Sequence, residues 1–190
     1  MAMAEDEFVQ FADAVAPRLR RTAFLLCGDW HTAEDLAQTT LAKVFASWHR
    51  IRDGDAVSAY AMRTLLNSYL AESRKKRLGE VLTSLVPERA VDPPSPELRM
   101  AVLEALATLP PRARAVVVLR YWADQSVDQT AALLDCSAGN VKSQSARALD
   151  KLRLLLDETA TEPRPAGFPT GAQTDTRGAG HGRDVAPRWT

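Results

Sequence analysis

Residues that build metal centres and disulfide frameworks are scarce in this sequence. The 190 residues include 2 cysteines and 3 histidines, too few for a disulfide framework. Cys27 and His31 lie four residues apart, but no second pair of ligands lies near them, so we expect no metal site. A glycine-rich phosphate loop, a nucleophile elbow and a cluster of histidines are missing too. We therefore expect neither an enzyme nor a protein with a cofactor, which leaves the binding of macromolecules.

Long apolar runs are also missing. No stretch reaches the roughly 18 consecutive apolar residues that a membrane-spanning helix needs, so we expect no insertion into a membrane. The first residues, MAMAEDEFVQ, are acidic, whereas a signal peptide begins with basic residues followed by an apolar segment. The sequence therefore predicts a cytoplasmic protein.

An excess of either charge is missing as well, because 24 basic residues balance 24 acidic ones. Proteins that bind DNA tightly on their own usually have a cationic surface that releases counterions, so a neutral chain argues against such binding. The charge is unevenly distributed, however. The first 60 residues have more acids than bases, whereas residues 63–77 contain one acid, Glu72, and five bases: Arg63, Arg74, Lys75, Lys76 and Arg77. This asymmetry predicts two different partners.

Helical periodicity is what the sequence does contain. Apolar residues recur at three- and four-residue steps in residues 6–27, 32–48 and 57–77, and again from residue 97 to residue 156. Prolines gather at residues 87–96, and a segment rich in Pro, Gly and Thr follows Asp157. We predict an all-α fold with two small helical domains, residues 1–78 and 97–156, joined by a Pro-rich linker (79–96) and followed by a disordered tail (157–190).

Local signals predict where the first helices end and begin. Pro17 is expected to kink or divide the first helix, and Gly28 with Asp29 to end it. Thr32 is the expected cap of the second helix, with Glu34 and Asp35 in its first turn. A solvated acidic turn explains these two carboxylates without any partner.

The segment from Ser126 to Leu156 has the pattern of a helix-turn-helix. Ser126 and Gln129 form a capping-box pattern, and Ser137 can cap a second helix after a tight turn. One face of this second helix is apolar. The opposite face has short polar and cationic side chains of the kind that contact base edges and phosphates: Asn140, Ser143, Gln144, Arg147 and Lys151. An ordinary helical hairpin with a solvated polar face has the same pattern.

The helix predicted at residues 57–77 offers a second candidate DNA surface. Its RKKR cluster can bind phosphates, but basic residues in a last helical turn also stabilise the helix dipole. Asn67 is a poor helix former, and its side chain can read a base edge.

Four strings resemble a known family when they are taken in order. They are FADAVAPRLRRTAFLLCGDWHTAEDLAQTTLAKVFASW and AYAMRTLLNSYLAESRKKR, then ALATLPPRARAVVVLRYW and AALLDCSAGNVKSQSARALDKLR. The first two resemble the second domain of sigma-70-type RNA polymerase sigma factors, and the last two resemble the fourth domain. The two-domain layout is similar to that of extracytoplasmic-function sigma factors. The sequence of these motifs looks most like that of the SigE-like subgroup found in actinobacteria.

This resemblance implies core RNA polymerase and promoter DNA as partners. The acidic motif of the second helix would dock on the β′ clamp helices through Glu34, Asp35, Leu36 and Gln38. The minus-ten element would be captured by the loop at residues 51–56 and by Arg63, Asn67, Tyr69, Arg74, Lys75, Lys76 and Arg77. A possible anti-sigma factor is implied as a further partner, because relatives are commonly held inactive by one.

The resemblance implies that the second helix of the helix-turn-helix reads the minus-thirty-five element. The residues near bases or phosphates would be Asn140, Lys142, Ser143, Gln144 and Arg147. The apolar helix before the motif would partly form the domain core and partly receive the β flap, through Val116, Val117, Leu119, Tyr121 and Trp122. We therefore predict a promoter-specificity sigma factor. One alternative is a helix-turn-helix transcriptional regulator that binds an operator without polymerase. The other is a protein-interaction adaptor, for which the RKKR cluster and Arg147 would be dispensable for DNA binding.

Overall fold

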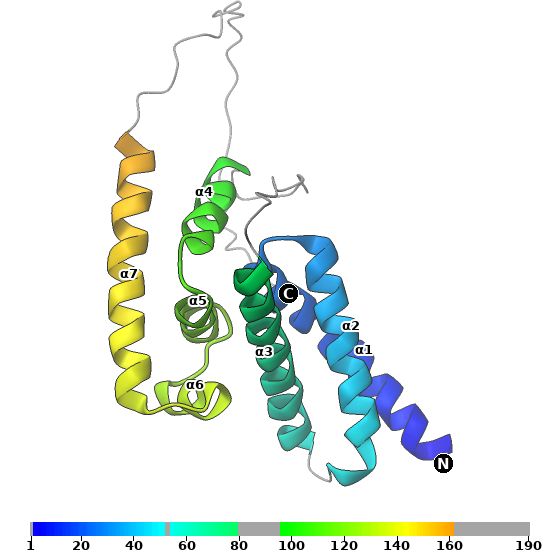
Figure 1. Cartoon of the computed structure of the whole chain (residues 1–190). Helices are drawn as coiled ribbons and strands as arrows, with labels where there is room; N and C mark the ends of the chain where they lie inside the picture. Colours follow the sequence, from blue (N-terminus) through cyan, green and yellow to red (C-terminus); the bar gives the residue numbers. More distant parts are fainter. Residues whose placement is uncertain (1, 52–53, 80–95, 162–190) are drawn as a thin grey trace, which may run out of the picture.

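The computed structural model describes residues 2–51, 54–79 and 96–161, and in these ranges all regular structure is helical. Residues 80–95 of the predicted linker and residues 162–190 of the predicted tail lie outside the described residues. The helices in chain order are α1 (Ala2–Cys27), α2 (Trp30–Ser47), η1 (Trp48–Arg50), α3 (Gly54–Gly79), α4 (Pro96–Ala107), α5 (Pro111–Val117), η2 (Val118–Trp122), α6 (Val127–Leu134) and α7 (Ala138–Thr161). The predicted all-α fold is confirmed (Figure 1).

Helices α1, α2 and α3 form the first half of the molecule. Their apolar faces meet in a core whose completely buried side chains include Leu19, Leu26, Val44, Leu65 and Leu66. Aromatic rings join α1 to the end of α2 and to η1, where Phe8 lies 4.8 Å from Phe45 and 5.2 Å from Trp48, between ring centroids. Burial of apolar faces is what stabilises three such helices in water.

The structure corrects one prediction about the first helices and narrows another. Of the two outcomes expected at Pro17, division does not occur, because α1 is continuous from Ala2 to Cys27. The cap of α2 is Asp29 and not Thr32: the Asp29 carboxylate accepts a hydrogen bond of 2.6 Å from the Thr32 backbone N–H. Because α2 starts at Trp30, Glu34 and Asp35 lie beyond its first turn. Gly28, with φ +79°, separates the two helices as expected, since glycine adopts this conformation without steric cost.

The second half consists of α4 to α7, with α7 packed against α4, α5 and α6. The predicted caps of the helix-turn-helix are both present: Ser126 and Gln129 form the capping box of α6, and the Ser137 hydroxyl accepts from the Asn140 N–H. Asp135, with φ +49°, makes the tight turn. The segment ARAVVVLRYW, expected as one α-helix, becomes α5 and the π-helical turn η2.

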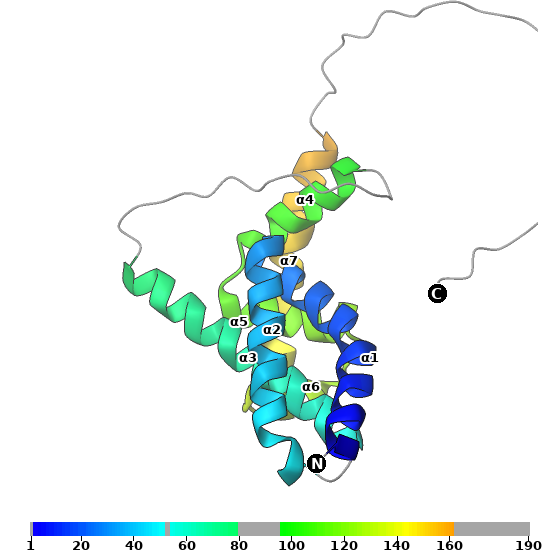
Figure 2. The ribbon, with the colours of Figure 1, turned by 90° about the vertical axis from the view of Figure 1, so that its right-hand side faces the viewer.

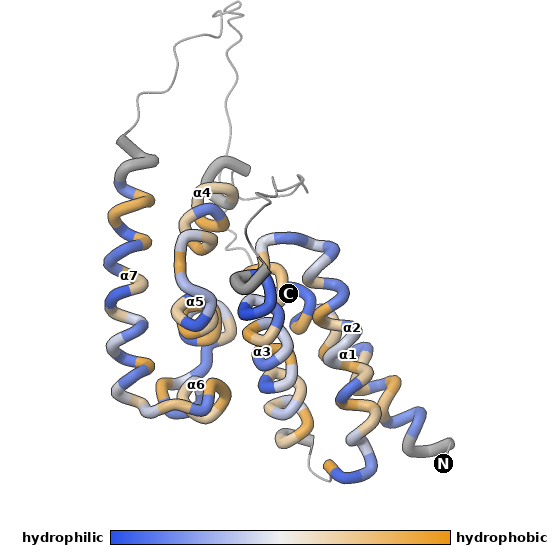
Figure 3. Tube along the Cα trace, viewed as in Figure 1, coloured by the Kyte–Doolittle hydropathy of each residue, from blue (hydrophilic) through white to orange (hydrophobic). Residues whose placement is uncertain are grey.

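Helix α7 ends later than the sequence suggested. It runs to Thr161, so residues 157–161 are helical, whereas the sequence predicts a disordered tail from residue 157. No proline or glycine precedes Pro163 in this segment, so nothing in the sequence stops the helix at residue 157. Hydrophobic residues recur between hydrophilic ones along α7 (Figure 3), and their three- and four-residue steps give the helix one apolar face.

The two halves pack against each other. Helices α5 and α6 lie beside α3, and α4 also contacts α1 (Figures 1 and 2). One cluster of buried residues extends across both halves, from Leu19 and Leu65 to Val116, Leu119 and Val141. The sequence predicted two domains but not this shared core.

Candidate nucleic-acid and polymerase interfaces

The exposed face of α7 is organised by hydrogen bonds between its polar side chains. The Gln144 side-chain amide donates to the Asn140 Oδ1 at 2.7 Å, and the Ser143 hydroxyl donates to the Asn140 carbonyl at 3.1 Å. Asn140 and Arg147 are exposed, whereas Ser143 and Gln144 are half-buried. Val141, Ser145 and Ala148 anchor the opposite side of the helix in the core. Four of the five predicted minus-thirty-five residues therefore share one outward face.

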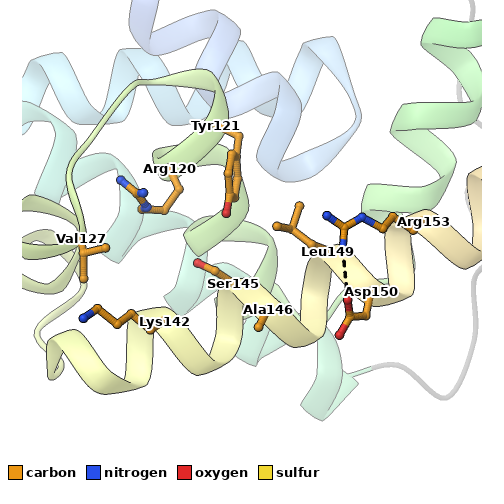
Figure 4. Close-up of a pocket in the computed structure, with 9 residues that line it drawn as sticks. All are labelled: Arg120, Tyr121, Val127, Lys142, Ser145, Ala146, Leu149, Asp150 and Arg153. Atoms are coloured by element: carbon orange, nitrogen blue, oxygen red, sulfur yellow. Dashed lines mark hydrogen bonds and ion pairs between the residues drawn. The ribbon is translucent and has the colours of Figure 1, made fainter.

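Lys142 does not share that face. It lines a shallow pocket of about 350 Å³ on another side of α7, together with Arg120, Tyr121, Ser145 and Arg153 (Figure 4). Arg153 forms an exposed ion pair with Asp150, and the Arg120 guanidinium donates to the Gln125 carbonyl. The structure thus separates Lys142 from the Asn140 face. Lys151 is also engaged elsewhere, because its ammonium donates to the Thr108 carbonyl at 2.9 Å.

The predicted minus-ten residues of α3 differ in their exposure and in their partners. Arg63, Asn67 and Arg74 fall at steps of four and seven residues and share a stripe; all three are exposed. Lys75 and Lys76 are exposed too. Arg77 lies in α3, but its side chain is outside the described residues, as are residues 52 and 53 of the predicted DNA-capturing loop. Arg63 already has a partner, because its guanidinium donates to the backbone carbonyl of Ala132 in α6.

Tyr69 lies on the other side of α3 and is only 5% exposed. It follows Met62, Leu65 and Leu66 at helical spacing, and all four belong to the core. Burial is the main cause that raises the pKa of its hydroxyl, with the charge of the nearby Arg114 acting in the opposite direction. In this arrangement the Tyr69 ring packs in the protein and is not presented to DNA.

The acidic motif of α2 is solvent-exposed except for its leucine. Glu34 pairs with Arg20 of α1 at 3.5 Å, and Asp35 lies 3.3 Å from the imidazole of His31. Gln38 is exposed, whereas Leu36 is 4% exposed and packs in the core. The three polar side chains of this motif therefore lie at the surface, whereas Leu36 anchors their helix in the core.

The predicted flap-binding residues divide in the same way. Val116, Val117 and Leu119 are buried, whereas Tyr121 and Trp122 are 52% and 57% exposed. The π-helical turn of η2 places these two aromatic rings at the surface just before the positive-φ residue Asp124. Short π-helical turns occur often at functional sites.

Two arginines of α5 were missed by the sequence reasoning. Arg112 donates to the Leu134 carbonyl at 2.7 Å, which joins α5 to α6. Arg114 donates to the Leu26 carbonyl of α1 at 2.7 Å and to the Ala107 carbonyl at 2.6 Å. Backbone carbonyls are present at every residue, so no sequence pattern marks these acceptors.

In the described residues, no group of three or more His, Cys, Asp or Glu side chains could hold a metal ion. The Cys27 thiol instead donates to the Asp29 carbonyl at 3.2 Å. Within the same part of the chain, no helix has both the length and the apolar character needed to cross a membrane.

Comparisons with known proteins place both halves in one family. The family model Sigma-70 region 2 matches residues 11–78, and the model Sigma-70, region 4 matches residues 99–152. The chain is 36% identical to the RNA polymerase sigma-E factor of Streptomyces avermitilis over 167 residues, which cover 85% of this chain and 93% of the relative. It is 31% identical to the ECF RNA polymerase sigma factor SigE of Mycolicibacterium smegmatis, over 77% of this chain and 60% of the relative.

A solved structure resembles most of the chain. It is the co-crystal structure of the sigma factor RpoE in complex with the anti-sigma factor NepR from Bartonella quintana, with a TM-score of 0.67 and 28% identity over 80% of this chain and 97% of that one. The chain therefore belongs to the extracytoplasmic-function group of sigma-70-type RNA polymerase sigma factors, with a SigE-like character, and it directs transcription by RNA polymerase.

Proposed function

We propose that this sigma factor reads a promoter with two separate helices, α7 at the minus-thirty-five element and α3 at the minus-ten element. The observation that carries the proposal is the outward face of α7, the second helix of a capped helix-turn-helix, on which Asn140, Gln144 and Arg147 lie. A helix held in this way presents its N-terminal residues to the major groove, and bidentate contacts from such side chains distinguish bases. On α3, the exposed Arg63–Asn67–Arg74 stripe and the neighbouring lysines provide the corresponding surface.

The test uses the full chain with core RNA polymerase. Run-off transcription and footprinting on a mapped promoter are compared for Arg147→Ala and Arg153→Ala, two exposed arginines of the same helix on different faces. Arg147→Ala is expected to weaken promoter binding by about 1–3 kcal/mol, an effect that disappears when the minus-thirty-five sequence is scrambled. Arg153→Ala should bind normally. An equal loss of binding on scrambled DNA would mean that Arg147 contacts phosphate and not a base.

The same reaction distinguishes the alternative function. An operator-binding regulator would shift the promoter fragment without polymerase and support no initiation. The neutral chain favours the sigma-factor role, because the affinity for DNA must then come largely from the complex with polymerase. We propose accordingly that the protein acts by binding and not by catalysis, and that it works in the cytoplasm.

We propose that Glu34, Asp35 and Gln38 dock on the β′ clamp helices of the polymerase, and that Tyr121 and Trp122 meet the β flap. Exposed carboxylates on a helix held by the buried Leu36, and two exposed aromatic rings, support these roles. The double substitution Glu34→Lys and Asp35→Lys should reduce core binding at least tenfold, because it reverses two charges at the interface. The matched control is Glu104→Lys on α4. A pull-down with unchanged affinity would remove the acidic motif from the polymerase interface.

An anti-sigma factor is a further proposed partner. The similar Bartonella quintana sigma factor is bound to the anti-sigma factor NepR in its co-crystal structure. The likeness covers 80% of the present chain and so includes residues of both halves, which supports a similar partner for this protein. Affinity purification of the tagged chain from its native cells, followed by a run-off assay with the captured protein added, tests whether such an inhibitor exists.

A further inference from the structure

The pocket on the Lys142 side of α7 has no role in the proposed function. It lies between η2, which supplies Arg120 and Tyr121, and α7, which supplies Lys142, Ser145 and Leu149 (Figure 4). Its volume of about 350 Å³ is at the small end of the range, roughly 300–1,000 Å³, of sites that hold small molecules. The pocket is therefore large enough for a small ligand.

Positive charge is concentrated around this pocket, although the whole chain is neutral. Three cations line it against one carboxylate, Asp150, and that carboxylate is paired with Arg153 at 3.3 Å. The Arg120 guanidinium donates to the neutral Gln125 carbonyl, and Lys142 has no hydrogen bond or ion pair with any described residue. Figure 4 shows the charged ends of Arg120 and Lys142 on the same side of the pocket. Two positive charges without a counter-charge in a concave site attract an anion.

A buried hydroxyl on the pocket wall lacks a partner. Ser145 is 7% exposed, and its hydroxyl has no hydrogen-bond partner in the described part of the chain. A serine within a helix often donates to the carbonyl four residues earlier, which here belongs to Val141, but this bond is not formed. The Ser145 hydroxyl points from α7 towards η2 (Figure 4). A buried donor without a partner costs free energy, so an acceptor atom of a ligand would stabilise the protein at this position.

We infer that this pocket binds the phosphate group of a small phosphorylated molecule of about the size of a mononucleotide. The inference goes beyond the proposed function and does not depend on it. The ammonium of Lys142, the guanidinium of Arg120 and the hydroxyl of Ser145 all donate, and a phosphate monoester has three strong acceptor oxygens for them. The half-exposed Tyr121 ring and the Leu149 side chain provide an apolar wall for the organic part of the ligand.

The site is tested by following a titration of the full chain by NMR. The probe is adenosine monophosphate, added at constant ionic strength so that the general screening of charges does not change. The backbone amide signals of η2 and of the residues around Ser145 should shift and reach saturation together. Shifts that rise without saturation, or that are as large at the RKKR cluster of α3, would show only a general attraction to cations and would overturn the inference.

Two lysines of α7 provide matched variants that each remove one positive charge. Lys142→Ala removes a cation from the pocket, whereas Lys151→Ala removes one that bonds to the Thr108 carbonyl outside the pocket. Lys142→Ala should weaken the binding of adenosine monophosphate about tenfold, as expected for the loss of a hydrogen bond to a charged group. Lys151→Ala should leave the affinity nearly unchanged. Equal losses in the two variants would contradict the inference, because the affinity would then depend only on the charge of the helix.

Ser145→Ala distinguishes a binding role of the hydroxyl from a structural one. Because this hydroxyl has no partner in the described structure, its removal should leave the thermal stability of the free protein unchanged or raise it. The same variant should weaken the binding of adenosine monophosphate about threefold to tenfold. A loss of thermal stability with unchanged affinity would give Ser145 a structural role and contradict the inference.

A DNA duplex distinguishes the source of the phosphate. Backbone phosphates have the same chemistry, and Lys142 belongs to the helix that is proposed to read DNA. A duplex of the mapped minus-thirty-five element, added at the same phosphate concentration, should shift signals on the Asn140 face and leave adenosine monophosphate bound in the pocket. Pocket shifts that appear with the duplex but not with adenosine monophosphate would assign Lys142 to the DNA backbone and overturn the inference.

Discussion

Helices α3 and α7 are the two proposed DNA-reading helices, and the polar faces of the two helices have different hydrogen-bond partners. The polar face of α7 points outward, and its side chains bond to one another, as Gln144 does to Asn140. The corresponding stripe on α3 bonds instead to the other half of the molecule, through Arg63. The difference shows that the exposure of a DNA-binding face depends on the elements packed beside it as well as on its own sequence.

The largest expected effect tests whether Tyr69 reads DNA or supports α3. Tyr69→Ala should destabilise the protein by about 3–5 kcal/mol, since it removes a large buried ring and leaves a cavity. Tyr69→Phe should retain the fold and the promoter affinity. Thermal unfolding and promoter footprinting measure the two effects. If the Tyr69→Ala protein is stable and has lost only its binding to the minus-ten element, then Tyr69 contacts DNA and does not support the fold.

An intermediate effect concerns how each reader binds DNA. Replacing Arg74, Lys75 and Lys76 with alanine should weaken promoter binding on all sequences and reduce the salt dependence, by a slope of about one for each phosphate that the variant no longer neutralises. The Arg147→Ala variant of α7 should change the sequence preference with little change in slope. Filter-binding titrations of the polymerase complex at several salt concentrations give both quantities. Sequence-dependent weakening from the α3 triple variant would reverse these roles.

The smallest expected effect is on folding stability and concerns the N-terminal caps of helices in the two halves. Asp29 caps α2 with a carboxylate whose pKa is lowered, mainly by the hydrogen bond from the Thr32 backbone N–H, whereas serine hydroxyls cap α6 and α7. The pKa of this carboxylate is lower in the folded state than in the unfolded state, where it is near 4. The carboxylate therefore stabilises the fold at pH values above the unfolded pKa, and this stabilisation is lost as the pH falls through the folded-state pKa. Asp29→Ala should therefore cost about 1 kcal/mol at neutral pH and progressively less in acid.

The control for this contrast is Ser126→Ala. Its cost should also be about 1 kcal/mol, but it should not depend on pH, because a hydroxyl cap does not titrate in this range. Chemical denaturation at a series of pH values between neutral and acid compares the two variants. Parallel pH profiles would mean that the Asp29 carboxylate does not contribute through its charge.

Local chemistry made much of the fold predictable from the sequence. The capping box at Ser126, the turn at Asp135 and the glycine at residue 28 act within a few residues, so their structures follow from the residues themselves. Periodicity likewise places Val141 and Leu65 in the core. The same periodicity places Tyr69 on the buried side of its helix, whereas the resemblance to the family assigns it to DNA.

The features that the sequence did not predict depend on contacts between distant parts of the chain. Arg63 and Ala132 are 69 residues apart, and Arg114 and Leu26 are 88 apart. Neither pair has a sequence signature, because each acceptor is a backbone carbonyl. The roles proposed for individual side chains at promoter and polymerase stay predictions. The cap at Asp29 was missed for a simpler reason, since Asp29 and Thr32 are both good capping residues and only the geometry selects one.

The hydrogen bond between Gln144 and Asn140 has a consequence for how promoter preference can change. Each amide fixes the orientation of the other, so substitution of Asn140 also releases Gln144. The two positions are then energetically coupled, and a double-mutant cycle should give a non-zero interaction energy for promoter binding. Under the role proposed for α7, a substitution of Asn140 should therefore also change the base preference at the position that Gln144 contacts.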